Sequence, residues 1–298
     1  MTLSKPLWQR LGETLNVPRL YLDELTSAAA EQQAHSRLIE TRRGVVEYAL
    51  GGAPDASEAV LISHQSMGGY DQCLVIGRRF PGRRVIAVSR AGYLRTPTLA
   101  GLTPDEMADT FAALLDALSI DRVVMAGYSA GAMAAISFAL RHSDRCRRLI
   151  LGCPVMGVLN RLVMDVLAPI ALANRSDFLN WVLSRTTATA LPLLERDPET
   201  LAILRAFQQT NPASARQAGY ALDIAQIRTF DPPLERIPIP TLIIAGAFDP
   251  LIPIQQTRRA AARISGAHLL VIPRGSHDCA VRHPAQIMPI MNDFLGGL

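Results

Sequence analysis

The sequence predicts an α/β fold: a mainly parallel, eight-stranded sheet flanked by helices, with an all-helical cap inserted between two strands. Three observations predict this fold. Short apolar runs alternate with helical stretches through most of the 298 residues. A glycine-flanked serine lies between one such run and a helix, and one long stretch has no strand-like run. Such alternation is typical of parallel sheets with helices on both faces.

The strands are expected in two groups. Residues 36–40 and 45–49 alternate apolar and polar side chains, as an antiparallel pair does. Six continuous apolar runs follow, each typical of a strand buried on both faces: residues 59–63, 85–88, 123–126, 149–151, 242–245 and 269–272. Helices are expected at residues 69–79, 103–118, 130–141, 253–264 and 284–295. One of them should begin with a capping box, because Thr103 precedes Pro104 and Glu106.

The same pattern divides the chain into domains. Residues 37–153 and 234–298 form the expected core, and residues 154–233, helical stretches broken by prolines, form the expected cap or lid. Residues 1–36 are expected to form an N-terminal helical extension of two short helices separated at Pro18. Three interpretations of this extension stay open: it docks on the core, it pairs with another subunit to give a homodimer, or it touches a membrane.

Composition and charge exclude several classes of protein. With 49% hydrophobic and 19% charged residues the chain is too apolar to be disordered. The 30 basic side chains are interleaved with 26 acidic ones, whereas a nucleic-acid surface needs clustered basic residues, so no nucleic-acid partner is expected. The N-terminus lacks the apolar segment of a signal peptide, and residues 162–173, interrupted by Asp165 and Pro169, are too short to span a bilayer. A cytoplasmic protein without a membrane span is expected.

Cysteine spacing gives no sign of a metal site. None of the four cysteines belongs to a C-x-x-C pair; they are Cys73, Cys146, Cys153 and Cys279. Cys73 in an apolar helix and Cys153 in an apolar strand are expected to be buried thiols, which fits a reducing compartment. The sequence therefore predicts neither a metal nor a disulfide framework.

Ser129 is the strongest candidate for a catalytic residue. It lies in Gly127-Tyr128-Ser129-Ala130-Gly131, between an apolar run and a helical stretch. A nucleophile at the tip of a sharp strand-to-helix turn needs small residues two positions away on either side, because the backbones approach closely there. The G-x-S-x-G pattern alone is common, but in this context it predicts a nucleophilic serine.

Two further candidates follow later strands. Asp249 comes just after the run at residues 242–245, and His277 lies on the loop after the run at 269–272. Two other acids are weaker candidates: Asp278 adjoins the histidine and should point away from its ring, and Asp231 lies in the proline-rich linker. The sequence therefore predicts a Ser129–Asp249–His277 triad.

On these residues the chain resembles the α/β-hydrolase superfamily over about residues 37–298. The order serine, aspartate, histidine is that of the family's triad, and residues 127–131 resemble its nucleophile elbow. Residues 64–69, His-Gln-Ser-Met-Gly-Gly, resemble the family's oxyanion loop, and residues 88–96 resemble the turn that follows its fourth strand. One residue departs from the pattern, since Gln65 stands where the family usually has glycine.

The resemblance implies a reaction and the groups that carry it. A serine nucleophile implies acyl transfer, whereas the dehalogenases and epoxide hydrolases of this fold use aspartate. The amides of Ala130 and Ser66 are implied as oxyanion donors, with Met67 in reserve. The main expectation is a carboxylic-ester hydrolase that needs no cofactor and acts on a small molecule. The alternatives are a C–C bond hydrolase, a cofactor-free perhydrolase or haloperoxidase, and a ligand receptor that retains the triad and turns over slowly.

The substrate pocket is expected to be largely apolar. Residues near the catalytic loops and from the cap are its candidate lining, at positions that equally suit core packing. They are Tyr128, Met67, Tyr70, Trp181, Met156 and Leu251.

Overall fold

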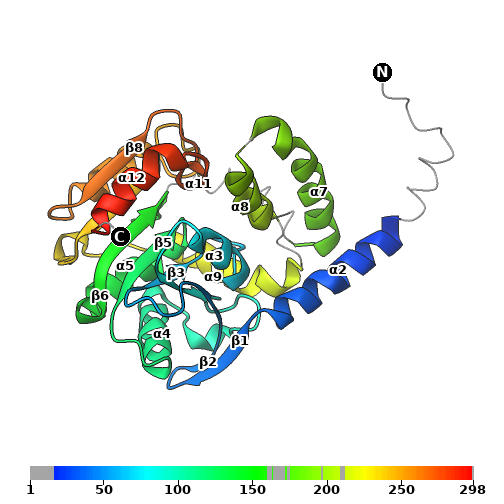
Figure 1. Ribbon diagram of the computed structural model, residues 1–298, viewed down its shortest axis with the longest axis horizontal. Coiled ribbons are helices and arrows are strands. Elements are labelled where there is room, and N and C mark those ends of the chain that lie inside the picture. Colours follow the sequence, from blue (N-terminus) through cyan, green and yellow to red (C-terminus); the bar gives the residue numbers. More distant parts are fainter. Residues whose placement is uncertain are drawn as a thin grey trace.

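An eight-stranded sheet forms the centre of the computed structural model, which describes residues 17–159, 163, 172, 175–195, 197–208 and 212–296 (Figure 1). The strands are β1 (Arg37–Thr41), β2 (Gly44–Gly52), β3 (Ala59–Ser63), β4 (Arg84–Val88), β5 (Val123–Tyr128), β6 (Cys146–Gly152), β7 (Thr241–Gly246) and β8 (His268–Ile272). Their order in the sheet is β1-β2-β4-β3-β5-β6-β7-β8. β2 pairs antiparallel with both β1 and β4, and the other pairs are parallel. The mainly parallel eight-stranded sheet predicted from the sequence is confirmed.

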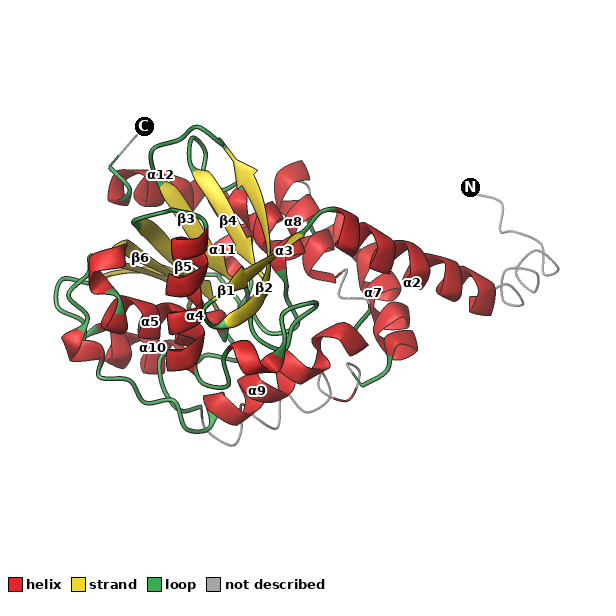
Figure 2. Cartoon of the chain, turned by 90° about the horizontal axis from the view of Figure 1, so that it is seen from below, coloured by secondary structure: helices red, strands yellow, loops and turns green. Residues whose placement is uncertain are grey.

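Helices cover both faces of this sheet (Figure 2). They are α2 (Val17–Ala34), α3 (Tyr70–Gly77), α4 (Pro104–Ala117), α5 (Gly131–Arg141), α7 (Asp177–Leu194), α8 (Pro198–Gln208), α9 (Gln217–Ile227), α10 (Ile254–Ala261), α11 (Cys279–Arg282) and α12 (Pro284–Phe294). Short 3₁₀ turns are η1 (Thr98–Ala100), η2 (Ser143–Arg145), η3 (Ser214–Arg216) and η4 (Leu234–Arg236). The predicted capping box is present, because Thr103 accepts from the Glu106 amide and Glu106 accepts from the Thr103 amide.

The alternation of side chains along β3 explains why both faces are covered. Leu61 packs in the apolar cluster that holds α4 and α5, whereas Val60 and Ile62 pack in the cluster that holds α3 and α12. Successive strand residues point to opposite faces, so a run of apolar residues needs a helical layer on each side. This burial fixes the strand positions that carry the candidate site.

The helical insertion, residues 154–233, lies between β6 and β7 and contains α7, α8, η3 and α9. The described part of this insertion has no strand, as the sequence predicts. Arg79, just past α3, joins it to the core: its guanidinium donates to Glu199 at 3.0 Å and to Thr200 at 3.0 Å. Figure 1 shows α8 next to α3, with α7 on the far side of α8.

The described part of the N-terminal extension is helical. α2 (Val17–Ala34) contains Leu22, Leu25 and Ala29, the residues of the second expected helix. The other expected helix, through Leu15, lies outside the described residues. α2 points away from the sheet (Figure 1), but its last turns contact the core, where the Tyr70 hydroxyl donates to the Gln32 carbonyl at 2.5 Å.

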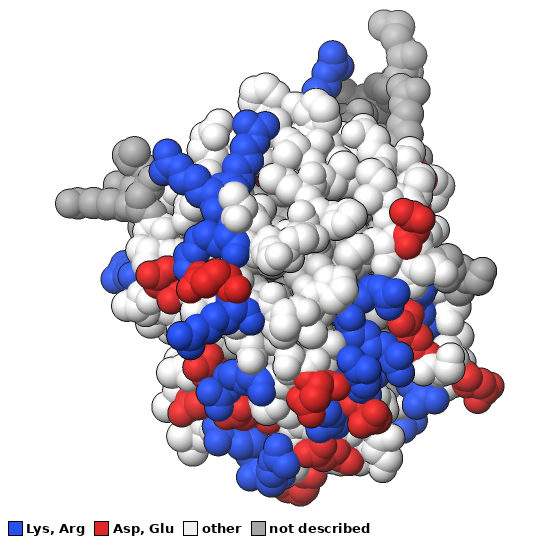
Figure 3. Space-filling view, turned by 90° about the vertical axis from the view of Figure 1, so that its left-hand side faces the viewer, with Lys and Arg blue, Asp and Glu red and all other residues white. Residues whose placement is uncertain are grey.

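The surface shows mixed charge. On the face drawn in Figure 3, arginine side chains lie beside aspartates and glutamates, and one area of the same face carries few charges. Among the described residues, no helix is both long and apolar enough to cross a membrane.

Candidate active site

Ser129 lies at a strained turn between β5 and α5. Its φ is 50°, in the left-handed region that non-glycine residues rarely adopt. The turn has no room for larger neighbours. A Cβ on Gly127 would lie 2.7 Å from the Ala135 Cβ, and one on Gly131 would lie 2.3 Å from the His64 carbonyl oxygen. The small residues of the G-x-S-x-G pattern therefore have the packing role that the sequence suggested.

The sheet register brings the candidate residues to one edge. Ser63 at the end of β3 pairs with Gly127 of β5, and Gly246 at the end of β7 pairs with Ile272 of β8. Because these strands are parallel, the loops after their carboxyl ends meet at the same edge.

Ser129, His277 and Asp249 are in hydrogen-bonding contact there. The His277 Nε2 lies 3.0 Å from the Ser129 Oγ, and its Nδ1 lies 2.8 Å from the Asp249 Oδ2. This arrangement orients one ring nitrogen toward a hydroxyl and the other toward a carboxylate. Chemically, the ring can accept a proton from Ser129 while the carboxylate holds its tautomer.

Asp249 is held in place by the backbone. Its Oδ1 accepts from the amides of Leu251 and Ile252, at 2.8 and 2.9 Å, and its Oδ2 remains for the histidine. The two alternative acids are engaged elsewhere: the Asp278 carboxylate accepts from Arg282, and the exposed Asp231 lies 3.7 Å from Arg263. Geometry thus favours Asp249 as the partner of His277.

The surroundings of His277 shift its basicity. Burial acts to lower its pKa, but the hydrogen bond and the negative charge of Asp249 outweigh it, so the pKa is raised above the ordinary value. A raised pKa makes the neutral ring a stronger base toward the Ser129 hydroxyl.

The amides of the two main oxyanion candidates differ in hydrogen bonding from that of the reserve candidate. Among the described residues, neither the Ala130 nor the Ser66 N–H donates to a protein acceptor. The reserve candidate differs, because the Met67 N–H donates to the Tyr93 hydroxyl at 3.4 Å. The geometry therefore favours Ser66 over Met67 as the second donor at this site.

The departure at Gln65 has a local explanation. Its side-chain amide donates to the buried Gln72 side chain, which donates in turn to the Phe207 carbonyl at 3.5 Å. Gln65 thus joins the loop after β3 to α3 and α8, an interaction that glycine could not make.

The six predicted pocket residues are divided between two environments. Tyr70 and Trp181 line a cavity of about 800 Å³ bounded by α2, α3, α7 and α8. The other four are absent from its lining. Tyr128 and Met156 are buried in the two core clusters, Leu251 packs half-buried against one of them, and Met67 is buried. Ser129 does not line this cavity either. Tyr70 directly follows the loop of residues 64–69, so the cavity adjoins that loop.

Cys153 lies close to the candidate triad. It follows β6 rather than lying within a strand as predicted, and it is buried, with its Sγ 3.3 Å from the Cys279 Sγ. The metal-binding atoms of Cys153, Asp249 and His277 lie within 4.8 Å of one another. However, Asp249 and His277 bind each other. The hydrogen bond between Cys153 and Cys279, together with burial, raises the pKa of the Cys153 thiol, which opposes the thiolate that a metal needs.

The chain is similar to proteins with the alpha/beta hydrolase fold and to several hydrolases. A family model described as alpha/beta hydrolase fold matches residues 58–284. The poly(3-hydroxyalkanoate) depolymerase of Ectopseudomonas oleovorans is 31% identical over 232 residues, 74% of each chain. The 2-hydroxy-6-oxononadienedioate/2-hydroxy-6-oxononatrienedioate hydrolase of Paraburkholderia xenovorans (strain LB400) is 24% identical over 90% of this chain and 98% of its own. An alpha/beta hydrolase fold protein from Nakamurella multipartita superposes with a TM-score of 0.70 at 27% identity, over 88% of this chain and 100% of its own.

Proposed function

The chain belongs to the alpha/beta hydrolase family, and from that premise we propose that it is a serine hydrolase of small-to-medium, largely apolar carboxylic esters. The observation that carries the proposal is the continuous contact from Ser129 through His277 to Asp249, at 3.0 and 2.8 Å. A histidine held between a hydroxyl and a buried carboxylate is the arrangement that turns serine into a nucleophile.

In the proposed reaction the Ser129 Oγ attacks the ester carbonyl carbon while its proton passes to the His277 Nε2. The amides of Ala130 and Ser66 hold the negative oxygen of the tetrahedral intermediate. His277 then donates the proton to the leaving alcohol, and the acyl group remains on Ser129. Water, deprotonated by His277, releases the acid and restores the serine. The mechanism uses only these groups and water.

The helical insertion acts in this proposal as a cap over the site. Its helices α7 and α8 form two walls of the 800 Å³ cavity, opposite α2 and α3. Both apolar and charged side chains line the cavity, so it suits a substrate group with an apolar body and a polar end. We assign this cavity to the part of the ester farther from the scissile bond.

A second candidate, C–C bond hydrolysis, is favoured by one observation. The 2-hydroxy-6-oxo acid hydrolase of Paraburkholderia matches this chain over nearly its whole length. The same three side chains could serve either reaction. A panel of p-nitrophenyl esters, thioesters, lactones and vinylogous diketones separates them: the ester proposal expects the p-nitrophenyl esters to be the best substrates. A kcat/KM that is highest on the vinylogous diketones would replace it with the second candidate.

The raised pKa of His277 sets the expected pH dependence. Only the neutral ring can accept the serine proton, so kcat/KM should rise with pH and level off above an apparent pKa higher than about 6.5. In Asp249→Asn the negative partner is lost, and this midpoint should move to lower pH. Initial rates on one ester between about pH 5 and pH 9 measure both profiles. A profile that falls as pH rises through this range would contradict His277 as the base.

Trp181 should influence which chain lengths are accepted. It lines the cavity, and its ring lies against Tyr21 and Phe178. Trp181→Ala enlarges the space, so relative kcat/KM should shift toward longer acyl or alcohol chains by about tenfold. The matched control is Phe178→Ala, because Phe178 packs on Trp181 without lining the cavity. Equal changes for all chain lengths would remove Trp181 from the pocket.

A further inference from the structure

A buried carboxylate from the helical insertion lies against the loop after β3, which we call the oxyanion loop (residues 64–69). Asp223 of α9 is only 1% exposed and accepts four hydrogen bonds. Arg90 donates two, at 2.5 and 2.8 Å, and Tyr93 donates one at 2.5 Å. The fourth comes from the Ser66 hydroxyl at 2.7 Å. Ser66, whose amide is the proposed oxyanion donor, is thus tied by its side chain to the insertion.

The other two partners of Asp223 also bind the oxyanion loop. The Arg90 Nε donates to the His64 carbonyl at 3.0 Å, and the Arg90 amide donates to the His64 ring at 3.0 Å. The Tyr93 hydroxyl accepts from the Met67 amide at 3.4 Å, and its ring packs edge-on against the His64 ring. Ser66 is therefore held through His64 and Met67 of the same loop and through its own hydroxyl.

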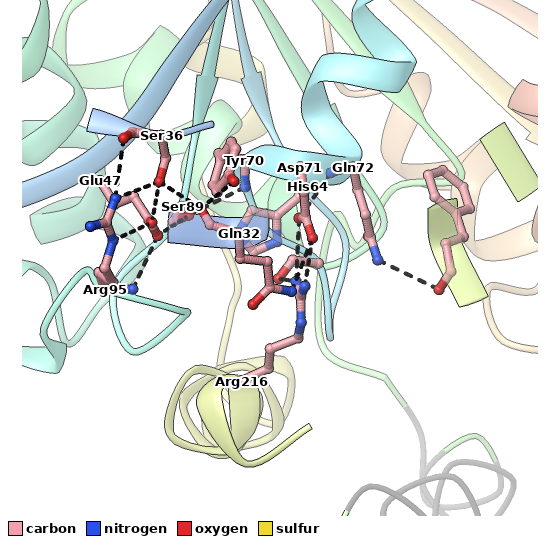
Figure 4. Close-up of polar contacts among 12 residues, drawn as sticks. Gln32, Ser36, Glu47, His64, Tyr70, Asp71, Gln72, Ser89, Arg95 and Arg216 are labelled. Carbon is pink, nitrogen blue, oxygen red and sulfur yellow. Dashed lines mark hydrogen bonds and ion pairs between the residues drawn. The ribbon is translucent and has the colours of Figure 1, made fainter. Parts of the chain in front are cut away.

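A second residue of the insertion reaches the far end of the same loop. Arg216 of η3 is fully buried and donates to the Gly68 carbonyl at 2.5 Å and to the Asp71 carboxylate at 2.6 Å. Figure 4 shows Arg216 reaching up from the insertion toward Asp71, near His64. The insertion contacts both the middle and the end of the loop.

From these contacts we propose that Asp223 is a positioning residue: through the Ser66 hydroxyl it sets the direction of the Ser66 amide toward the oxyanion. The proposal rests on the proposed function. Its physical basis is that a hydrogen bond to a buried carboxylate restricts the rotation of Ser66, while the two bonds from the Arg90 guanidinium hold that carboxylate in place. An amide fixed before the reaction stabilises the transition state without a reorganisation cost.

The sharpest probe is Ser66→Ala. It removes the hydroxyl and its bond to Asp223 but keeps the backbone amide that is the proposed donor. The loop should then sample other orientations, and kcat should fall by about 10- to 100-fold while KM changes little, because misplacement affects the transition state more than ground-state binding. Inactivation by an alkyl phosphonate, whose phosphoryl oxygen needs the same donors, should slow by a similar factor.

The matched control is Ser36→Ala. The Ser36 hydroxyl also donates to a buried carboxylate, that of Glu47, at 2.7 Å, but it lies near β1, outside the oxyanion loop and the cavity lining (Figure 4). This control should lose similar stability in thermal unfolding and keep its kcat and phosphonate rate. Asp223→Asn serves as a second variant: if it folds, it should lose at least as much kcat as Ser66→Ala.

Each result has a definite meaning. A selective loss of kcat and phosphonate rate in Ser66→Ala supports the proposal. Equal kinetics in Ser66→Ala and Ser36→Ala, or a change in KM alone, would overturn it while leaving the proposed function intact, provided that wild-type turnover depends on Ser129. Full activity in Ser129→Ala would instead overturn the proposed function itself.

Discussion

Ser129→Ala should remove nearly all turnover, with kcat on the best ester reduced by about 10³-fold or more. The hydroxyl that contacts the His277 Nε2 at 3.0 Å is lost, and no acyl-enzyme can form. Alanine tolerates the positive φ of 50° no better than serine does, so the free energy of unfolding should change little. Steady-state kinetics and thermal unfolding of the purified variant measure both effects.

The control for this variant is Ser137→Ala. Ser137 is buried in α5, so its replacement perturbs the helix that follows Ser129 without touching the contact with His277. It should retain wild-type kcat within a few-fold. If the two variants were equally active, Ser129 would not be the nucleophile.

Asp249→Asn should have the second largest effect, a decrease in kcat of up to about 10⁴-fold. The amide that replaces the carboxylate can donate to the His277 Nδ1, which favours the wrong ring tautomer and leaves the imidazolium without a negative partner. The amides of Leu251 and Ile252 can still donate to the remaining oxygen, so the loop should keep its shape.

Asp278→Asn is the internal comparison for the acid. Its carboxylate accepts from Arg282 and does not bind the His277 ring, so kcat should stay close to wild type. Both variants are compared at one pH on one substrate. A crippled Asp278→Asn beside an active Asp249→Asn would reverse the assignment.

The strands that carry the site could be predicted because their signal is local. The run Ala59–Ser63 is buried along its full length, so every side chain needs to be apolar or small, and the predicted bounds agree with β3. Glycine spacing around Ser129 was equally informative, since both glycines are required by contacts at less than 3 Å. Residues at successive strand ends are brought together by the topology itself.

Contacts between distant segments could not be predicted in the same way. Asp223 lies in an apolar stretch of α9, and nothing in its neighbours shows that Arg90, Ser66 and Tyr93 surround it from more than 100 residues away. An acidic residue within an apolar helical run was the one available signal.

The pocket was the least predictable part of the site. Apolar residues beside catalytic loops can either seal the core or face the substrate, and sequence pattern does not separate the two. Tyr70 and Trp181 reach the cavity because α3 and α7 form its walls, whereas Met156 is buried in the apolar cluster that holds α4 and α5. Which of these side chains lines the cavity and which is buried in the core depends on how the insertion packs on the core.

Covalent labelling with a fluorophosphonate tests the central claim most directly. The structure predicts one adduct per chain, located by peptide mass spectrometry at Ser129, and a labelling rate that falls steeply in His277→Ala, because the ring is needed to take the serine proton. An adduct on any other residue, or a rate that is unchanged in His277→Ala, would contradict the proposal that Ser129 and His277 form the reactive centre.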